Sequence, residues 1–328
     1  MKRANISIFV PHIGCPNNCA FCNQFLITGV QKAPTENDVI KAVKIATQSK
    51  GFDSKNTEIA FFGGSFTAID REYMLALLKA AYIFVENKTV SGIRISTRPD
   101  AITPEILEIL KSFGVTAIEL GAQSMCDSVL SLNKRGHLSN DVKTASKLIS
   151  SYGFELGLQM MTGLFGDDDE GAIFTANEFV KLGPKTVRIY PTIVLSDTFL
   201  ADKYKNGEYE PQTVDEAVKL CTRLTLIFEN AGINIIRLGL HTIDTNEYVA
   251  GPWHPAFSEL CENEIYKNII LSKLCVKGNY TASVARGEVS KTIGQKRSNI
   301  DYFESLGYIV KIKEDENLYP RNVKIERE

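Results

Sequence analysis

Short apolar stretches alternate along most of the chain with longer segments whose apolar residues recur every three or four positions. The first pattern predicts buried strands, and the second predicts helices with one apolar face. Thr35 and Asp38 form a capping-box-like start for one helix, and Pro104 lies in the first turn of another. The predicted strands are 6–10, 57–62, 92–96, 116–121, 154–161 and 185–191, and the predicted helices are 35–48, 70–85, 103–113, 127–132, 139–151 and 170–182. This alternation is typical of an α/β fold with a parallel sheet and helices outside it.

The regular alternation ends near residue 240. Six βα units make an incomplete (β/α) barrel, and a helix at 213–231 with a strand at 233–238 adds a weaker seventh return. Beyond it we expect a helix at 258–274 and a small charged segment from 275 to 328. We therefore predict a partial barrel at 1–240 and a C-terminal extension at 241–328 that covers or closes it.

Residues able to do chemistry follow the predicted strands. Barrels of this kind bind their substrates at the rim formed by the carboxyl ends of the strands. We therefore expect the segments after the six strands to share one rim: the loop holding Cys15, then Gly63-Gly64, Arg98, Gln123, 159–163 and 188–191.

Composition and charge narrow the class of protein. The 328 residues include 44% apolar and 23% charged residues, as in an ordinary globular protein, and the net charge is −2. The first apolar run, 6–10, is too short for a signal peptide, and no stretch is long enough to span a membrane. We expect a cytoplasmic, reducing location. Basic residues are scattered, with short clusters at 291–297 and 321–327, so nucleic acid is the less favoured partner.

Three cysteines near the N-terminus, Cys15, Cys19 and Cys22, are the most informative chemical feature. Three thiolates hold three irons of a four-iron cluster and leave the fourth iron open to another ligand. Zinc is the first alternative, with His12 as the nearest fourth ligand, because structural zinc sites have four protein ligands. Unpaired structural thiols are the second. Disulfides are disfavoured, because three clustered cysteines cannot all pair and nothing marks the chain as secreted.

The spacing CxxxCxxC, with Phe21 before the last cysteine, resembles the radical S-adenosylmethionine (SAM) superfamily. Further motifs resemble the branch that contains the Elongator catalytic subunit, and they extend from about residue 5 to about residue 255. They are 9–12 (FVPH), 21–24 (FCNQ), 62–67 (FGGSFT), 96–100 (STRPD) and 119–124 (ELGAQS). The resemblance implies a partial (β/α)6 TIM-like barrel, a [4Fe–4S] cluster on the three cysteines, and SAM bound to the open iron.

The resemblance also implies a set of SAM-binding residues. Gly63 and Gly64 match the motif that receives the SAM amino group, although Ser65 replaces the usual Glu. Arg135 matches an arginine that often reaches the SAM carboxylate. The implied set is Phe21, Gly63, Gly64, Ser65, Ser96, Gln123, Arg135, Gln159 and Met161. The alternatives are ordinary turns for the glycines and barrel core for Phe21 and Met161.

Several polar and aromatic residues are candidates for substrate contact at the same rim. Tyr190 and Trp253 could stack on a flat heterocycle, and Glu119 could accept hydrogen bonds from a guanine-like edge. The full set is His12, Asn23, Arg98, Glu119, Tyr190, Arg237, His241, Trp253 and His254. Each also has a structural alternative; Arg98, for example, could simply form a local ion pair with Asp100.

Three functional hypotheses follow. The first is a radical SAM carbon–nitrogen lyase acting on a small molecule. It is favoured because the sequence beyond the resemblance is too short for the acetyltransferase domain of the Elongator branch. The layout resembles queuine lyases, compact members that cleave the free base queuine to 7-aminomethyl-7-deazaguanine. The second hypothesis is a tRNA-modifying radical SAM enzyme, and the third is a metal-binding interaction protein without turnover. Either enzyme would need a one-electron donor such as flavodoxin or ferredoxin.

Overall fold

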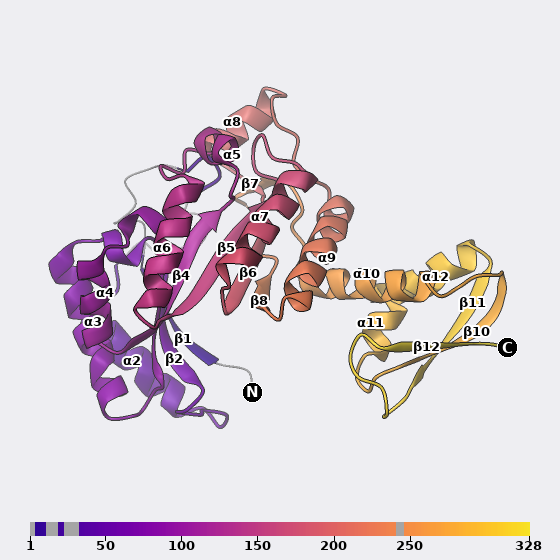
Figure 1. The fold of residues 1–328 in the computed structure, drawn as a ribbon, viewed down its shortest axis with the longest axis horizontal. Helices are drawn as coiled ribbons and strands as arrows, with labels where there is room; N and C mark the ends of the chain where they lie inside the picture. The colour runs from indigo at the N-terminus through magenta and orange to yellow at the C-terminus, as the bar shows by residue number, and fades with distance from the viewer. Residues whose placement is uncertain (1–3, 11–18, 23–32, 241–245) are drawn as a thin grey trace.

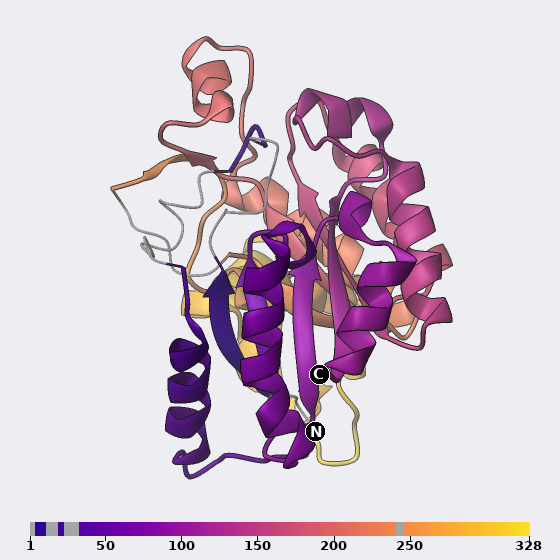
Figure 2. The same cartoon turned by 90° about the vertical axis from the view of Figure 1, so that its left-hand side faces the viewer.

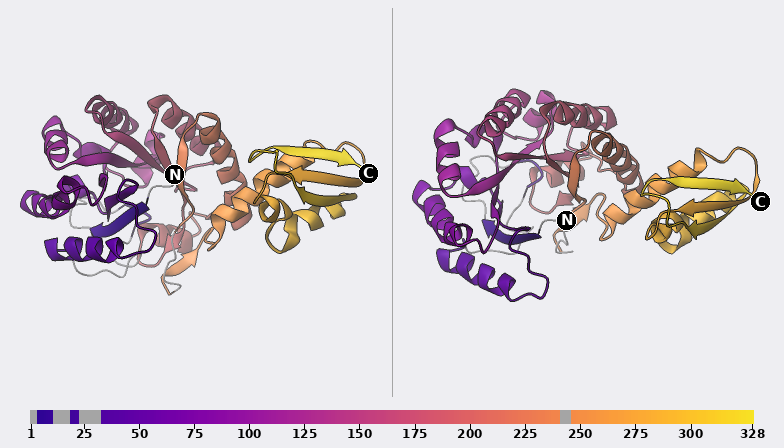
Figure 3. Two further views of the ribbon diagram at one scale, coloured as in Figure 1. Left: turned by 90° about the horizontal axis from the view of Figure 1, so that it is seen from below. Right: turned by 60° about the horizontal axis from the view of Figure 1, so that its bottom comes forward.

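Seven parallel strands form one curled sheet in the computed structural model, which describes residues 4–10, 19–22, 33–240 and 246–328. Figures 1 to 3 show the sheet surrounded on its outer side by helices, which gives a half-barrel. In sheet order, the strands are β1 (Ala4–Val10), β2 (Thr57–Gly63), β3 (Gly92–Thr97), β4 (Val115–Gln123), β5 (Glu155–Thr162), β6 (Thr186–Pro191) and β8 (Asn234–Leu238). The predicted α/β partial barrel is confirmed, and the weaker seventh return is a true edge strand paired parallel with β6.

Most helices pack on the outer face of this sheet. Alternate strand residues such as Ile59, Phe61 and Ile93 are fully buried there and form the main hydrophobic core. The predicted capping box is present, with the Thr35 N–H donating to the Asp38 carboxylate over 2.8 Å. The helices are α2 (Glu36–Thr47), α3 (Arg71–Glu86), α4 (Pro104–Ser112), α5 (Asp127–Leu132), α6 (Ser139–Ser151), α7 (Asp169–Leu182) and α9 (Val214–Asn230), with short 3₁₀ turns η1 (Phe66–Ala68) and η2 (Pro99–Ala101).

An excursion between β6 and β8 extends above the carboxyl ends of the strands. It contains β7 (Val194–Leu195) and α8 (Phe199–Lys205), and β7 pairs antiparallel with β9 (Tyr248–Ala250), which follows β8. Figures 1 and 2 show α8 at this end of the half-barrel. The sequence pattern did not predict α8, because a helix of two turns has too few apolar repeats to be recognised.

The end of the chain forms a small unit with its own hydrophobic core. Helix α10 (Phe257–Leu271) leads into it from the barrel, as Figure 1 shows. The buried residues of this core include Tyr266, Ile270 and Phe303. We call residues 266–328 the C-terminal unit. Its other elements are β10 (Gly278–Val284), α11 (Val289–Ile293), η3 (Gln295–Arg297), α12 (Ser298–Ser305), β11 (Tyr308–Glu314) and β12 (Val323–Arg327), and its sheet order is β11-β10-β12.

The sequence analysis predicted only a charged segment here. Strands β11 and β12 are short and alternate core residues with exposed charges. So few positions give too weak a sequence pattern to predict a strand. The division of the chain at residue 240 stays a prediction. No helix in the described part of the chain combines the length and the apolar character needed to cross a membrane.

Candidate functional site

The described part of the cysteine loop, residues 19–22, is fastened to two other segments. The Ala20 N–H donates to the Asn133 carbonyl over 3.0 Å, and the Ala20 carbonyl accepts from the Leu200 N–H over 2.8 Å. Within the loop, the Cys22 N–H donates to the Cys19 carbonyl over 3.1 Å. The turn after α5 and the start of α8 therefore hold Cys19 and Cys22 over the open end of the half-barrel.

Arg135 links the cysteine loop to the end of β4. One guanidinium nitrogen lies 2.8 Å from Cys19 Sγ, and another donates to the Gly121 carbonyl over 2.7 Å. Cys19 is 8% exposed and Arg135 is 7% exposed, so water screens this contact weakly. Arg135 therefore fixes the position of the Cys19 sulfur relative to the end of β4.

The two glycines at the end of β2 leave room at the rim. Gly63 has φ of +112°, and a Cβ there would lie 2.4 Å from the Phe9 ring and 2.5 Å from the Val10 carbonyl. Only glycine fits this position. The Gly64 N–H donates to the same carbonyl, and the Ser65 hydroxyl bonds to Thr97 Oγ1 over 2.8 Å and accepts from the Arg98 N–H. Ser65 therefore ties β2 to β3 in this structure.

A buried amide at the end of β4 has unused hydrogen-bonding capacity. Gln123 has φ of +68°, an uncommon value for a residue other than glycine, and follows an irregularity in the β4–β5 pairing. Within the described part of the chain, no hydrogen-bond partner reaches its Oε1. Buried polar atoms normally have partners, so this oxygen is positioned for a bound ligand.

These features fit a [4Fe–4S] cluster with SAM. Cys19 and Cys22 would supply sulfur ligands, the glycines leave space for a ligand near the backbone, and Gln123 offers an acceptor. Cys15 lies outside the described residues, so the full ligand set stays a prediction. Among the described residues, no three His, Cys, Asp or Glu side chains are arranged to bind a metal ion. The zinc alternative needs His12, which lies outside the described residues, so it also stays a prediction.

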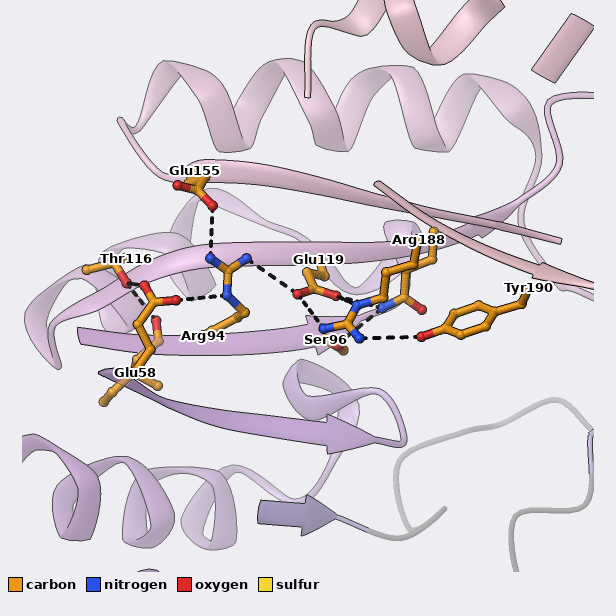
Figure 4. Close-up of polar contacts among 10 residues, drawn as sticks. Glu58, Arg94, Ser96, Thr116, Glu119, Glu155, Arg188 and Tyr190 are labelled. Atoms are coloured by element: carbon orange, nitrogen blue, oxygen red, sulfur yellow. Dashed lines mark hydrogen bonds and ion pairs between the residues drawn. The ribbon is translucent and has the colours of Figure 1, made fainter. Parts of the chain in front are cut away.

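A network of buried charges covers the inner wall of the sheet, as Figure 4 shows. The carboxylate of Glu119, 1% exposed, accepts two bonds from the Arg188 guanidinium, at 2.6 and 3.1 Å, and one from the Gln159 amide at 3.0 Å. Arg94 bonds to Glu58 and Glu155 at 2.9 Å each and reaches Glu119 at 3.4 Å. The network forms a rigid polar floor below the rim.

Side chains above this floor are the ones that a ligand inside the half-barrel would meet. The Gln159 amide lies 3.4 Å from Ser96 Oγ, and the Tyr190 hydroxyl lies 3.5 Å from an Arg188 nitrogen. Met161 pairs in register with Tyr190 and is partly exposed, whereas the neighbouring Met160 is fully buried in the outer core. The structure therefore brings Ser96, Gln159, Met161 and Tyr190 together on the inner face.

Other predicted substrate contacts have structural partners. Arg98 pairs with Asp100 at 2.7 Å, which matches the local ion pair considered as its alternative. Glu119 is enclosed by its network. Arg237 donates to the Gly239 and Leu240 carbonyls, which fixes the end of β8. The rings of Trp253 and Tyr248 lie 6.2 Å apart, and His254 Nδ1 accepts from the Ala256 N–H before α10.

Some predictions lie outside the described residues: Cys15, His12, Asn23 and His241. Phe21 is described and packs in a small cluster with Leu200, Tyr209 and Phe165, with the Arg135 guanidinium 5.8 Å from its ring. The described cysteines are all free of disulfides. Burial raises the pKa of the Cys221 thiol to about 12, so that residue is a core thiol.

Arg188 and Arg94 are the main residues that the sequence reasoning missed as part of the site. Each lies between apolar neighbours in a strand, as Glu119 does, and Glu58 is the second residue of the buried strand β2. A charged residue at alternate positions of otherwise buried strands is the signal that could have indicated the network. The side-chain period of two then places all four on the inner face.

His137 shows how strongly the rim is desolvated. Burial, together with the nearby Arg135 cation, lowers the pKa of this histidine to about 4. Its Nε2 lies 3.3 Å from the Ala122 carbonyl, so the neutral ring donates one hydrogen bond there. The ring is therefore neutral at pH 7 and supports the Arg135 segment.

The sequence matches two family models. One describes the radical SAM superfamily and covers residues 9–179, and the other describes the radical SAM C-terminal domain and covers residues 184–267. Among curated relatives, a tRNA uridine(34) acetyltransferase of Dehalococcoides mccartyi is 26% identical over 239 residues, which are 63% of this chain and 52% of that protein. An uncharacterized protein of Methanocaldococcus jannaschii is 31% identical over 220 residues, 66% of this chain and 63% of that protein. Human Elongator complex protein 3 is 26% identical over 53% of this chain and 36% of its own length.

These matches span only about a third to two thirds of the relatives' lengths. Among solved structures, an archaeal Elp3 of Methanocaldococcus infernus lacking its N-terminus covers 85% of this chain and 66% of that chain, with a TM-score of 0.66 and 21% identity. At this identity the likeness shows the fold. The superfamily model covers more than half of the chain. The chain therefore belongs to the radical SAM superfamily, whose members use a [4Fe–4S] cluster and SAM.

Proposed function

We propose that this radical SAM enzyme acts on a nucleobase. The observation that carries the catalytic part is the contact of the Arg135 guanidinium with Cys19 Sγ. When bound, the cluster on Cys15, Cys19 and Cys22, together with SAM, supplies a 5′-deoxyadenosyl radical that removes one hydrogen atom from the substrate. The chain's own task is to hold both partners in position and keep water out.

The polar floor suits a flat heterocycle with several donors and acceptors. The Gln159 amide, the Arg188 guanidinium and the Tyr190 hydroxyl lie on neighbouring strands, and all three belong to or touch one network. Because Glu119 binds Arg188 through two bonds, that guanidinium is held in one orientation. A fixed set of polar groups selects a base edge, and the partly exposed Met161 offers an apolar contact.

Within this class, our first candidate reaction is queuine lyase activity. A hydrogen atom would be taken from a hydroxyl-bearing carbon of the cyclopentenediol of the free base, and the bond from the ring to the aminomethyl nitrogen would break as the hydroxyl proton passes to that nitrogen. The ring would keep the unpaired electron as a carbonyl-stabilised radical, which one electron from the reductant and one proton would convert to a cyclopentenone. The product would be 7-aminomethyl-7-deazaguanine. Support comes from the deazaguanine edge, which offers the donors and acceptors that the polar floor can pair.

An anaerobic assay tests this candidate. The reconstituted chain is incubated with SAM, a reductant and queuine, and the aminomethyl base and 5′-deoxyadenosine are measured by mass spectrometry. We expect the two products to form together. Cys19→Ala should abolish both, while Cys126→Ala, at a half-buried cysteine outside the loop, should retain both. Unchanged queuine alongside steady 5′-deoxyadenosine formation would exclude the lyase reaction and leave the radical SAM reading intact.

A base carried in tRNA is the second candidate. The specific observation in its favour is that curated relatives at 26–28% identity are named tRNA uridine(34) acetyltransferases. The same anaerobic assay distinguishes the two candidates if deuterated tRNA replaces queuine. Deuterium in the released 5′-deoxyadenosine would show hydrogen abstraction from tRNA. We further propose a flavodoxin or ferredoxin as electron donor and a cytoplasmic location.

A further inference from the structure

Two arginines lie side by side on the inner face of the half-barrel, where β6 and β8 end. Arg188 and Arg237 are register partners in the parallel pairing of these strands. Two like charges at neighbouring positions repel each other unless each has an anionic partner. Glu119 is that partner for Arg188. No carboxylate among the residues that the structure describes forms an ion pair with Arg237, so within this part of the chain its charge is not neutralised.

Backbone contacts hold the Arg237 charge in place. Its guanidinium donates to the Gly239 carbonyl over 3.0 Å and to the Leu240 carbonyl over 2.6 Å. Both acceptors are neutral, so they fix the orientation of the side chain and leave its positive charge. The side chain is half-buried, which reduces screening of that charge by water. A fixed, poorly screened cation suits a group that gains negative charge only during a reaction.

The Tyr190 hydroxyl is the polar group on which both cations act. Its oxygen accepts from an Arg188 nitrogen over 3.5 Å, a contact that Figure 4 shows. Burial raises the pKa of Tyr190 above its usual value, and the positive charges of Arg188 and Arg237 oppose that rise. The phenol is therefore protonated at pH 7. Among the described residues none accepts its hydrogen, so the O–H group can donate to a ligand.

We propose that Tyr190 donates a hydrogen bond to the substrate oxygen that turns from a hydroxyl into a carbonyl, and that Arg188 and Arg237 stabilise the negative charge on that oxygen. The inference rests on the proposed lyase reaction beside a hydroxyl-bearing carbon. There the hydroxyl proton passes to the departing nitrogen, the carbon–nitrogen bond breaks and the ring keeps one unpaired electron. One electron from the reductant then gives an enolate, and a proton from water adds to its carbon. Tyr190 keeps its own proton throughout.

This role differs from the selection of a base edge, which Gln159 and Ser96 can still provide. A hydrogen bond that is equally strong before and during the reaction only tightens binding. One that strengthens as the oxygen gains charge accelerates the step in which that charge appears. Removing a single donor of this second kind lowers a rate by roughly a hundredfold to a thousandfold. The two roles of Tyr190 therefore predict different losses.

Turnover of deuterated queuine separates the two roles. Tyr190→Phe keeps the ring and removes only the hydroxyl. With deuterium on the hydroxyl-bearing carbon, we expect the label still to enter 5′-deoxyadenosine, whereas release of the aminomethyl base falls by roughly a hundredfold and queuine affinity is retained. Tyr204→Phe, at an exposed tyrosine on α8, is the matched control and should behave like the parent. Parent-like release from Tyr190→Phe would overturn the proposal, as would a loss of queuine affinity that accounts for the whole defect.

A binding measurement on the metal-free full chain is independent of turnover. 1,3-Cyclopentanedione is an enolate at neutral pH, and cyclopentanone is an uncharged counterpart; ligand-observed NMR measures the affinity of both. We expect the parent to prefer the enolate by about tenfold, since a fixed cation and a donor meet its oxygen. Tyr190→Phe and Arg237→Gln should each lose most of this preference, and Arg237→Lys should keep part of it because it keeps the charge.

The matched control for Arg237 is Arg223→Gln, because Arg223 forms only exposed ion pairs on α9 and should be dispensable for the preference. Equal affinity of the parent for both probes would overturn the anion subsite, whatever happens to queuine. An enolate preference that depends on Tyr190 and Arg237 while queuine stays unchanged would exclude the queuine reaction and support the subsite. The failure of the proposed reaction and the failure of this inference are therefore distinguished.

Discussion

Replacing Arg135 by Gln should loosen the cysteine loop and weaken iron binding. The guanidinium is the side-chain bridge between Cys19 and the end of β4, through bonds of 2.8 Å to Sγ and 2.7 Å to the Gly121 carbonyl. The shorter Gln side chain cannot reach both. Each hydrogen bond to a charged group contributes about 1.5–3 kcal/mol, and an abandoned buried carbonyl costs about 1–3 kcal/mol more.

Of these two bonds, only the one to Cys19 holds the cysteine loop. A loss of about 1.5–3 kcal/mol there corresponds to roughly tenfold to a hundredfold weaker retention of the cluster, since about 1.4 kcal/mol is a factor of ten. Iron per chain is measured after anaerobic reconstitution, during stepwise addition of a chelator. Arg135→Lys should fall between Gln and the parent, because it keeps the charge but loses one of the two bonds.

A second measurement needs no iron. The Ala20 amide is held by the Asn133 carbonyl, so hydrogen exchange at residues 19–22 in the metal-free chain reports how firmly the loop is fastened. We expect faster exchange in Arg135→Gln. Lys134→Gln is the matched control, since the Lys134 ammonium lies over the Phe199 ring and touches neither cysteine. Parent-like exchange and parent-like iron retention in Arg135→Gln would refute the assigned role.

Three further predictions concern stability. Glu119→Gln should lower the free energy of unfolding by about 3–5 kcal/mol in urea titrations, because the buried Arg188 would lose its partner, and a loss below 1 kcal/mol would contradict the network. Burial raises the pKa of Asp167 from 3.8 to about 6, because the ionised carboxylate is disfavoured in the folded protein. The contribution of this group to stability is therefore full below pH 3.8 and is lost as the pH rises through about 6. Asp167→Asn should therefore be more stable than the parent by about 1–2 kcal/mol at pH 7, a value reduced for partial exposure, and a gain that persisted at pH 3.5 would refute this cause. Arg321→Gln should free the β11–β12 loop from Glu229 and Glu262, seen as faster hydrogen exchange at 315–322, and unchanged exchange would show that the ion pairs do not hold the loop.

The sequence by itself determined the order of the barrel elements. Apolar runs of strand length and helices with clear start signals at Thr35 and Pro104 reflect local energetics that need no distant partner. The sequence also indicated the cysteine motif and Gly63, because metal ligation and a positive φ each restrict the residue type directly.

Only the tertiary structure decided which polar residues meet. Arg135 contacts Cys19 across more than a hundred residues of sequence, and Arg188 on β6 contacts Glu119 on β4 across the intervening strand β5. Such pairs depend on sheet register and on the alternation of inward and outward faces, which one-dimensional spacing does not specify. The C-terminal unit was concealed for a related reason. Its short strands each bury few side chains, and their core becomes apparent only when β10, β11 and β12 pair against α10 and α12.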